Sequence, residues 1–466
     1  MLWLGNAACA EVMSFPLEFY TAVALLVFLG GEACYRLRRS WAIPALVVYG
    51  TVGLWYLGDI LYNGMDTVYA TFGSEWVHRS LLQVVLFLAA YRFFIHILIR
   101  QDRDPNEAAD LASRLNPVSI EKLLLWLSVL WAALFVLGIS RVDWDVWAIL
   151  WPPSREEKTV MFGHSGMGAG ADFLVAACNY VYILVCASLG IVFVLSRGYV
   201  RGAALLLMAF AWPYFWFDRM RNIMLALLMP GLFTYWFSTQ RGWGRKLAVS
   251  AVVFGFVNLW FLGVMRYRED NQNLGAILQF RAEEESSQHL GLDMFTELCW
   301  MNALMDVGSF RPDWGQSYLA QIAQVVPRTL WANKPMIGID YAIARGFGGT
   351  GMNDSAENAA GVFATVTTGM IGGGVANFGQ FLGVLAVALI MALWTKILAC
   401  LWLRRFELLR FFLFAVGCGL TINMGRDITL LVLWPFVFGY IGVVLIEKFK
   451  LGSGQRARAP VASGHI

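Results

Sequence analysis

Residues 325–335 read Val-Val-Pro-Arg-Thr-Leu-Trp-Ala-Asn-Lys-Pro. They lie inside residues 266–375, a long and mostly polar stretch in a chain otherwise built of apolar runs. Arginines and the carboxylate run 283–285 precede them, and glycine-rich turns with Asp354 and Glu357 follow. This arrangement predicts a bundle of membrane helices capped on one side by a large loop. We expect the functional site to lie where that loop meets the helices.

The composition predicts an all-α polytopic membrane protein. Hydrophobic residues make up 59% of the 466 residues and charged residues 14%, and the mean hydropathy is +0.60. A soluble domain carries about 25% charged residues. The chain is therefore expected to expose apolar side chains to lipid rather than to water.

The sequence lacks the common motifs for metals, disulfides and nucleotides. Its seven cysteines show no CxxC or CxxH spacing and its five histidines are dispersed, so neither a disulfide framework nor a metal site is predicted. It has no P-loop and no glycine-rich turn between a strand and a helix. We expect no cofactor and no nucleic-acid partner.

A membrane-spanning helix needs about 20 apolar residues, and about eleven stretches are candidates. They are 15–35, 41–61, 80–99, 121–140, 172–195, 201–217, 222–238, 247–265, 376–401, 411–424 and 428–446. This count predicts an N-terminal bundle of about eight spans at 1–265, an outer loop at 266–375, further membrane helices at 376–446 and a disordered cytoplasmic tail at 447–466.

Local patterns predict some structure inside the two longest loops. Residues 274–307 and 317–326 have helical periodicity, and the Gly-rich residues 346–374 are open to interpretation as a re-entrant element. In the loop at 141–171, three tryptophans share one helical face, which indicates an interfacial helix rather than a sugar-stacking platform. They are Trp144, Trp147 and Trp151.

Basic segments predict the orientation of the bundle. Each odd-numbered span is followed by one, and the positive-inside rule places such segments in the cytoplasm. They lie at 36–39, 100–122, 197–201, 241–246, 404–410 and 448–458. The N-terminus and the long loop are then outside, and the C-terminus is inside.

Several arginines lie on the predicted outer side, against this rule. For Arg79 and Arg141 we favour snorkelling to lipid phosphates or pairing with a neighbouring carboxylate. The others lie in very short outer turns or at the end of the eighth span, where a cation is costly without a partner. They are Arg219, Arg221, Arg266, Arg268 and Arg426. Residues two apart do not share a helical face, so we expect one of each close pair to point into a site.

These features together resemble the O-antigen polymerase (Wzy-type) family of oligosaccharide repeat-unit polymerases. The similarity covers roughly residues 206–445. The string Pro-Arg-Thr-Leu-Trp-Ala-Asn-Lys-Pro at 327–335 is its most specific part. The arginine-bearing turns at 218–222 and 425–427 and the segment Ala-Asn-Phe-Gly at 376–379 complete the pattern.

The resemblance implies an integral-membrane glycosyltransferase of a GT-C-like multi-span architecture. It implies metal-independent, inverting polymerisation of repeat units carried on undecaprenyl diphosphate, at the periplasmic face of a bacterial inner membrane. The product would be a surface polysaccharide such as the O-antigen of lipopolysaccharide or an exopolysaccharide. The implied partners are the lipid-linked glycan donor and acceptor, membrane lipids, a chain-length regulator and a flippase.

Without a metal ion, fixed cations must stabilise the charge that develops on the diphosphate leaving group. Arginine suits this role because its guanidinium binds phosphate through two donors. The candidate diphosphate-binding residues are Arg219, Arg221, Arg266, Arg328, Lys334 and Arg426.

An acceptor hydroxyl also needs a general base within hydrogen-bond reach. Five outer residues are candidates for this catalytic role, and we rank Glu357 first and His164 second. The other three are Asp354, Asp306 and His289.

Two other functions are compatible with the sequence. An O-antigen ligase would use the same donor with a lipid A core acceptor and shares the multi-span plan. A transporter or flippase of lipid-linked sugars belongs to a different class and should carry ionisable residues or broken helices at mid-membrane. The charges gather at the outer edge instead, which favours chemistry there.

Overall fold

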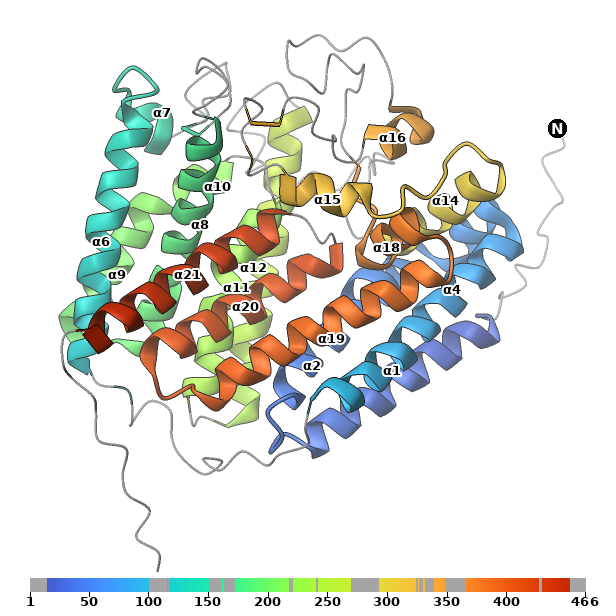
Figure 1. The fold of residues 1–466 in the computed structure, drawn as a ribbon, viewed down its shortest axis with the longest axis horizontal. Coiled ribbons are helices and arrows are strands. Elements are labelled where there is room, and N and C mark those ends of the chain that lie inside the picture. The colour runs from blue at the N-terminus through green and yellow to red at the C-terminus, as the bar shows by residue number, and fades with distance from the viewer. Residues whose placement is uncertain are drawn as a thin grey trace, which may run out of the picture.

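The computed structural model describes most of the chain. The described residues are 15–99, 115, 117–150, 161–162, 172–217, 221–239, 242–269, 293–323, 326, 330–331, 339–347, 366–426 and 430–452. They form helices and contain no strand, as the composition predicts. The protein is therefore all-α in its described part (Figure 1).

The helices before the long polar stretch are α1 (Leu17–Tyr35), α2 (Ala42–Val52), the π-helix η1 (Gly53–Leu57), α3 (Gly58–Asn63), α4 (Met65–Leu98), α6 (Pro117–Ile139), α7 (Val146–Leu150), α8 (Asp172–Leu195), α9 (Gly198–Ala211), α10 (Pro213–Phe217), α11 (Arg221–Ser238) and α12 (Trp243–Glu269). Those within and after it are α14 (Met294–Asp306), α15 (Gln316–Ala323), α16 (Ile339–Ala342), the π-helix η3 (Ile343–Phe347), α18 (Met370–Phe378), α19 (Leu382–Leu403), α20 (Leu408–Arg426) and α21 (Leu430–Gly452).

Seven helical segments of the described part are long and apolar enough to cross a membrane. They are Leu17–Tyr35, Ala42–Asn63, Met65–Leu98, Ser119–Ile139, Ala177–Leu195, Leu382–Leu403 and Leu408–Arg426. The protein is a polytopic membrane protein. The four other predicted spans also fall on helices, namely α9–α10, α11, α12 and α21, and their crossing of the membrane stays a prediction.

Helix α20 forms the centre of the bundle. Its residues 410–425 are all buried, and it packs against α2, α11, α19 and α21. Helices α4 and α19, far apart in the sequence, pack along each other beside it (Figure 1).

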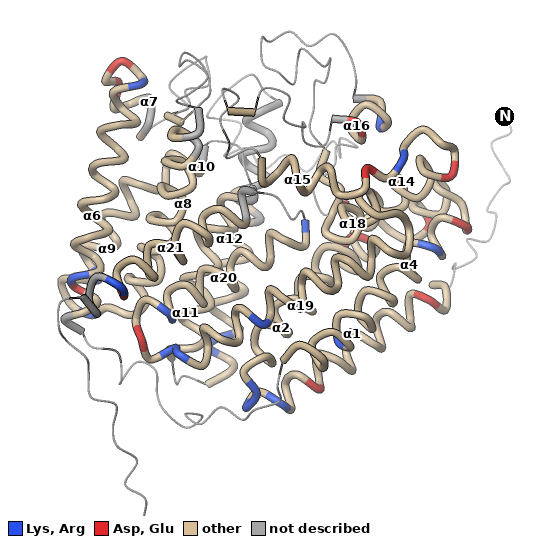
Figure 2. Tube along the Cα trace, viewed as in Figure 1, with Lys and Arg blue, Asp and Glu red and all other residues tan. Residues whose placement is uncertain are grey.

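The two edges of the bundle differ in their charged residues. Figure 2 shows Lys and Arg gathered along the lower edge, at the ends of α1 and α9 and at the turn between α19 and α20. We call this the basic edge. The opposite, loop-bearing edge carries α7, α10, α14, α15 and α16 (Figure 1). The six basic segments were predicted to share one side, and the described ones lie on one edge.

Candidate functional site

The structure describes only part of the predicted site. Glu357, His164, Arg219, Arg328 and Lys334 lie outside the described residues, as do the alternative bases Asp354 and His289. Arg221 begins α11 and Arg266 lies in the last turn of α12, but their side chains are outside the described part. The site is therefore built from Arg426 and its surroundings.

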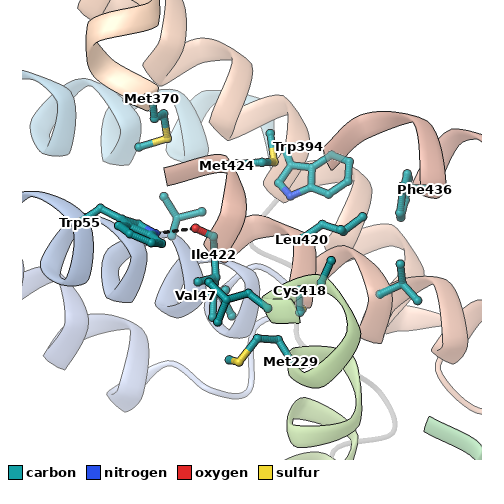
Figure 3. Close-up of a cluster of buried hydrophobic side chains, with 14 of the residues drawn as sticks. Val47, Trp55, Met229, Met370, Trp394, Cys418, Leu420, Ile422, Met424 and Phe436 are labelled. Atoms are coloured by element: carbon teal, nitrogen blue, oxygen red, sulfur yellow. Dashed lines mark hydrogen bonds between the residues drawn. The ribbon is translucent and has the colours of Figure 1, made fainter. Parts of the chain in front are cut away.

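Arg426 is the last residue of the buried central helix α20. Two contacts hold that helix end against the α2–η1 segment. The indole Nε1 of Trp55 donates a hydrogen bond to the carbonyl oxygen of Ile422 at 2.6 Å (Figure 3). The hydroxyl of Thr51 donates to the carbonyl oxygen of Val47 at 2.8 Å and lies 3.4 Å from that of Thr421. These contacts fix the point from which Arg426 extends.

Gly425 makes this close approach possible. A Cβ at this position would meet Cγ2 of Thr51 and would lie 2.5 Å from Cδ1 of Trp55. Real Cβ atoms do not approach other carbons so closely, because van der Waals repulsion rises steeply below about 3.5 Å. Tight packing therefore requires a glycine at position 425, and this packing fixes the backbone that carries the Arg426 cation.

Arg426 is in contact with the end of the long polar stretch. Its Nε donates a hydrogen bond to Oγ1 of Thr367 at 3.4 Å, and the pair is partly buried. Thr367 lies just before α18, within the Gly-rich residues 346–374. The structure thus brings Arg426 of the C-terminal arginine turn into contact with the stretch at 266–375.

Helix α18 is held in place by glycines at both ends. Gly369 and Gly379 have φ angles of +75° and +85°, which favour glycine. A Cβ on Gly369 would lie 2.7 Å from the hydroxyl of Tyr56, and that hydroxyl accepts a hydrogen bond from the amide of Ile371 at 2.6 Å. The α2–η1 segment therefore positions α18 as well as α20.

A buried ion pair joins two parts of the long stretch, and one of them, α14, packs against α4 of the bundle. Arg345 on η3 donates two hydrogen bonds to the Glu297 carboxylate on α14, at 2.8 and 3.1 Å. The two side chains are 8% and 3% exposed. Tyr341 donates to the same carboxylate, and the Arg345 guanidinium lies 4.2 Å from the ring centre of Trp300. We call these four residues the Glu297–Arg345 clamp.

The clamp changes the proton affinity of its members. Burial opposes the charge of Arg345, but hydrogen bonds and attraction from Glu297 outweigh it and raise the pKa of Arg345 above its usual value. Burial and the neighbouring Glu297 carboxylate raise the pKa of Tyr341 well above its usual value. Arg345 is therefore charged and Tyr341 neutral at physiological pH, which suits a structural connection rather than proton transfer.

Asp306 is paired rather than available as a base. It accepts hydrogen bonds from Arg79 at 2.6 Å, Trp76 at 3.0 Å and Gln380 at 2.9 Å. Burial opposes its ionisation, but these donors and the Arg79 charge prevail and lower the pKa of Asp306. A carboxylate of lowered pKa is a weak base, so Asp306 is a poor candidate for that role. Arg79 also pairs with Glu75, in line with the predicted pairing to carboxylates.

Sequence reasoning missed the clamp and the support for Arg426 from α2 and η1. Their partners lie far apart in the chain, and neither has a short motif. Within the described residues, no group of three or more His, Cys, Asp and Glu side chains is arranged to hold a metal ion.

No protein family, no curated protein and no solved structure matches this chain. The geometry around Arg426 and the resemblance in sequence pattern are thus the grounds on which a function is proposed.

Proposed function

We propose that this chain is an integral-membrane glycosyltransferase that polymerises oligosaccharide repeat units carried on undecaprenyl diphosphate. A hydroxyl oxygen of the incoming unit attacks the anomeric carbon of the growing glycan. The bond from that carbon to the diphosphate oxygen breaks with inversion, and the diphosphate leaves with the electron pair. The hydroxyl proton passes to a base, for which Glu357 is the first candidate and His164 the second.

The observation that carries this proposal is the position of Arg426. It ends the buried central helix and contacts Thr367 of the long polar stretch. A cation held by tight packing needs little reorganisation when charge develops on a leaving group, and such preorganised groups stabilise transition states most effectively. Arg426 is therefore well suited to bind the departing diphosphate.

The rest of the proposed site completes a cluster of cations. Arg219 or Arg221, Arg266, Arg328 and Lys334 would join Arg426 on the diphosphates of donor and acceptor. Two lipid diphosphates bring several negative charges together, so more than one arginine is needed.

The proposal includes a topology and a cellular location. We propose eleven spans in a GT-C-like arrangement, in the inner membrane of a bacterium. The N-terminus and the loop-bearing edge face the periplasm, and the C-terminus and the basic edge face the cytoplasm. A flippase supplying the lipid-linked unit and a chain-length regulator are the expected protein partners.

The test is reconstitution of the purified protein with a lipid-linked repeat unit in EDTA. Polymerase activity produces a ladder of lipid-linked glycans, and the chelator leaves the ladder intact because no metal is required. A strict need for Mg²⁺ or Mn²⁺ would point to a carboxylate-metal site instead. Transfer only to added lipid A core would identify a ligase, and movement of the unit across the bilayer without new bonds would identify a transporter.

A further inference from the structure

Helix α15 turns its largest apolar side chains outward. Ala320, Gln321 and Ala323 are buried, whereas Leu319 and Ile322 are 48% and 64% exposed. Residues three apart lie on the same helical face, so these two side chains form one apolar surface. A helix facing water turns its Leu and Ile inward and its Gln outward. The outer face of α15 therefore fits an apolar environment.

Trp314, just before α15, adds to this surface. It is 72% exposed and has a φ angle of +54°, which is rare for a bulky residue. Asp313 holds this conformation, because its carboxylate accepts hydrogen bonds from the amides of Gly315 and Ser317 at 3.1 and 2.9 Å. A large indole is thus held outward by a rigid turn. We call Trp314, Leu319 and Ile322 the α15 apolar surface.

A second exposed tryptophan with a positive φ angle occurs elsewhere on the loop-bearing edge. Asp143 and Trp144 precede α7, and Trp144 also has a positive φ angle, +62°, and is 65% exposed. Exposed tryptophans are typical of the membrane–water interface. Figure 1 shows α7 and α15 both on the loop-bearing edge.

Helix α15 is connected to the candidate diphosphate site through α18. The amide of Tyr318 donates to Oδ1 of Asn377 on α18 at 3.4 Å, and the rings of Tyr318 and Phe378 lie 6.1 Å apart. The segment leading into α18 contacts Arg426 through Thr367, and α18 itself packs against α20. One short helix therefore links the apolar surface to the cation.

We propose that the α15 apolar surface binds the polyprenyl chain of the lipid carrier, close to its diphosphate. This inference rests on the proposed function. The hydrocarbon of such a carrier is bonded directly to the diphosphate, so a diphosphate at Arg426 brings the first isoprene units to the neighbouring elements. An apolar surface that is linked through α18 to a fixed cation matches the two halves of the carrier.

Site-specific photo-crosslinking tests the proposal. A benzophenone amino acid replaces Ile322 in the full-length protein, which is reconstituted in phospholipid nanodiscs containing undecaprenyl diphosphate. The control position is Val252 on α12, which is 72% exposed and belongs to a predicted membrane span. Burial of one apolar side chain against a bound lipid strengthens the binding of that lipid about tenfold. We expect Ile322 to capture the polyprenyl lipid about tenfold more than Val252 does.

Two outcomes would overturn the proposal. Equal capture of polyprenyl lipid at the two positions would make α15 an ordinary lipid-facing helix. Capture of a peptide of the same chain at Ile322 would show that another segment covers the surface. Polymerisation by the same nanodiscs is measured in parallel with a lipid-linked repeat unit. A glycan ladder without preferential capture refutes the α15 inference alone, whereas absence of both also counts against the proposed function.

Discussion

At the scale of single residues, Gly425 determines where Arg426 lies. A Cβ on Gly425 would overlap Thr51 and Trp55, and overpacking of a tight contact costs about 1–3 kcal/mol. We expect Gly425→Ala to lower the thermal unfolding temperature in detergent and to reduce polymer formation, because the end of α20 must move. Both quantities are measured on the same purified preparation.

Gly442→Ala is the matched control, because a Cβ on Gly442 of α21 meets no atom within 4 Å. Alanine is favoured over glycine within a helix by about 1 kcal/mol, so this variant should be as stable as the wild type or more so. Equal stability of the Gly425 and Gly442 variants would contradict the packing described for Arg426.

The sequence predicts the importance of Arg426 but not the role of Gly425. Arg426 is conspicuous because it interrupts two apolar runs at a very short turn. The role of Gly425 depends on Thr51 of α2 and Trp55 of η1, which lie near the other end of the chain. No local sequence pattern predicts that contact. The predicted partners of Arg426 at 328 and 334 lie outside the described residues.

At the scale of elements, the Glu297–Arg345 clamp holds α16 and η3 on α14. Removing one member of a buried ion pair costs about 3–5 kcal/mol, because the other charge is left uncompensated. We expect Arg345→Met to release residues 339–347, which hydrogen exchange measured by mass spectrometry would detect as faster exchange of that peptide.

The double variant Glu297→Gln with Arg345→Met separates charge from shape. It removes both charges and keeps similar volumes, so protection of residues 339–347 should return in large part. Unchanged exchange in the Arg345→Met single variant would mean that other contacts hold this segment, and the clamp would then have no structural role.

The lengths of the apolar runs predict where most helices lie, but they do not predict the places where the helical backbone is irregular. Each of the eleven predicted stretches falls mainly on helix in the described residues, with a break at residues 379–381 inside 376–401. The helical patterns at 274–307 and 317–326 overlap α14 and α15. The sequence did not reveal the π-helix η1 or the break at Gly73 inside α4, where φ is +75°. Helix α4 begins at Met65 rather than at residue 80, and Trp76 and Arg79 of its first part donate hydrogen bonds to Asp306 of α14.

At the scale of the whole molecule, the proposed function requires the loop-bearing edge to face the periplasm. We expect a cysteine at Gln316 to react with a membrane-impermeant maleimide in intact spheroplasts. A cysteine at Arg245, on the basic edge, should react only after the membrane is permeabilised. The native cysteines are first replaced, since Cys34 and Cys400 are exposed. The reverse labelling pattern would invert the topology and remove the site from the periplasm.

The central claim is that a fixed arginine at the end of α20 stabilises the diphosphate leaving group, and Arg426→Lys tests it most directly. Lysine keeps the charge but loses the paired donors. Loss of about 2–4 kcal/mol of transition-state stabilisation slows the reaction roughly 30- to 1,000-fold. The measurement is the initial rate of glycan-ladder formation by purified protein, with membrane insertion verified. Arg79→Lys is the control, because Arg79 pairs with Glu75 and Asp306 and a lysine ammonium retains an ion pair there. The prediction is a strong loss for Arg426→Lys and a nearly normal rate for Arg79→Lys. A wild-type rate for Arg426→Lys would contradict the claim.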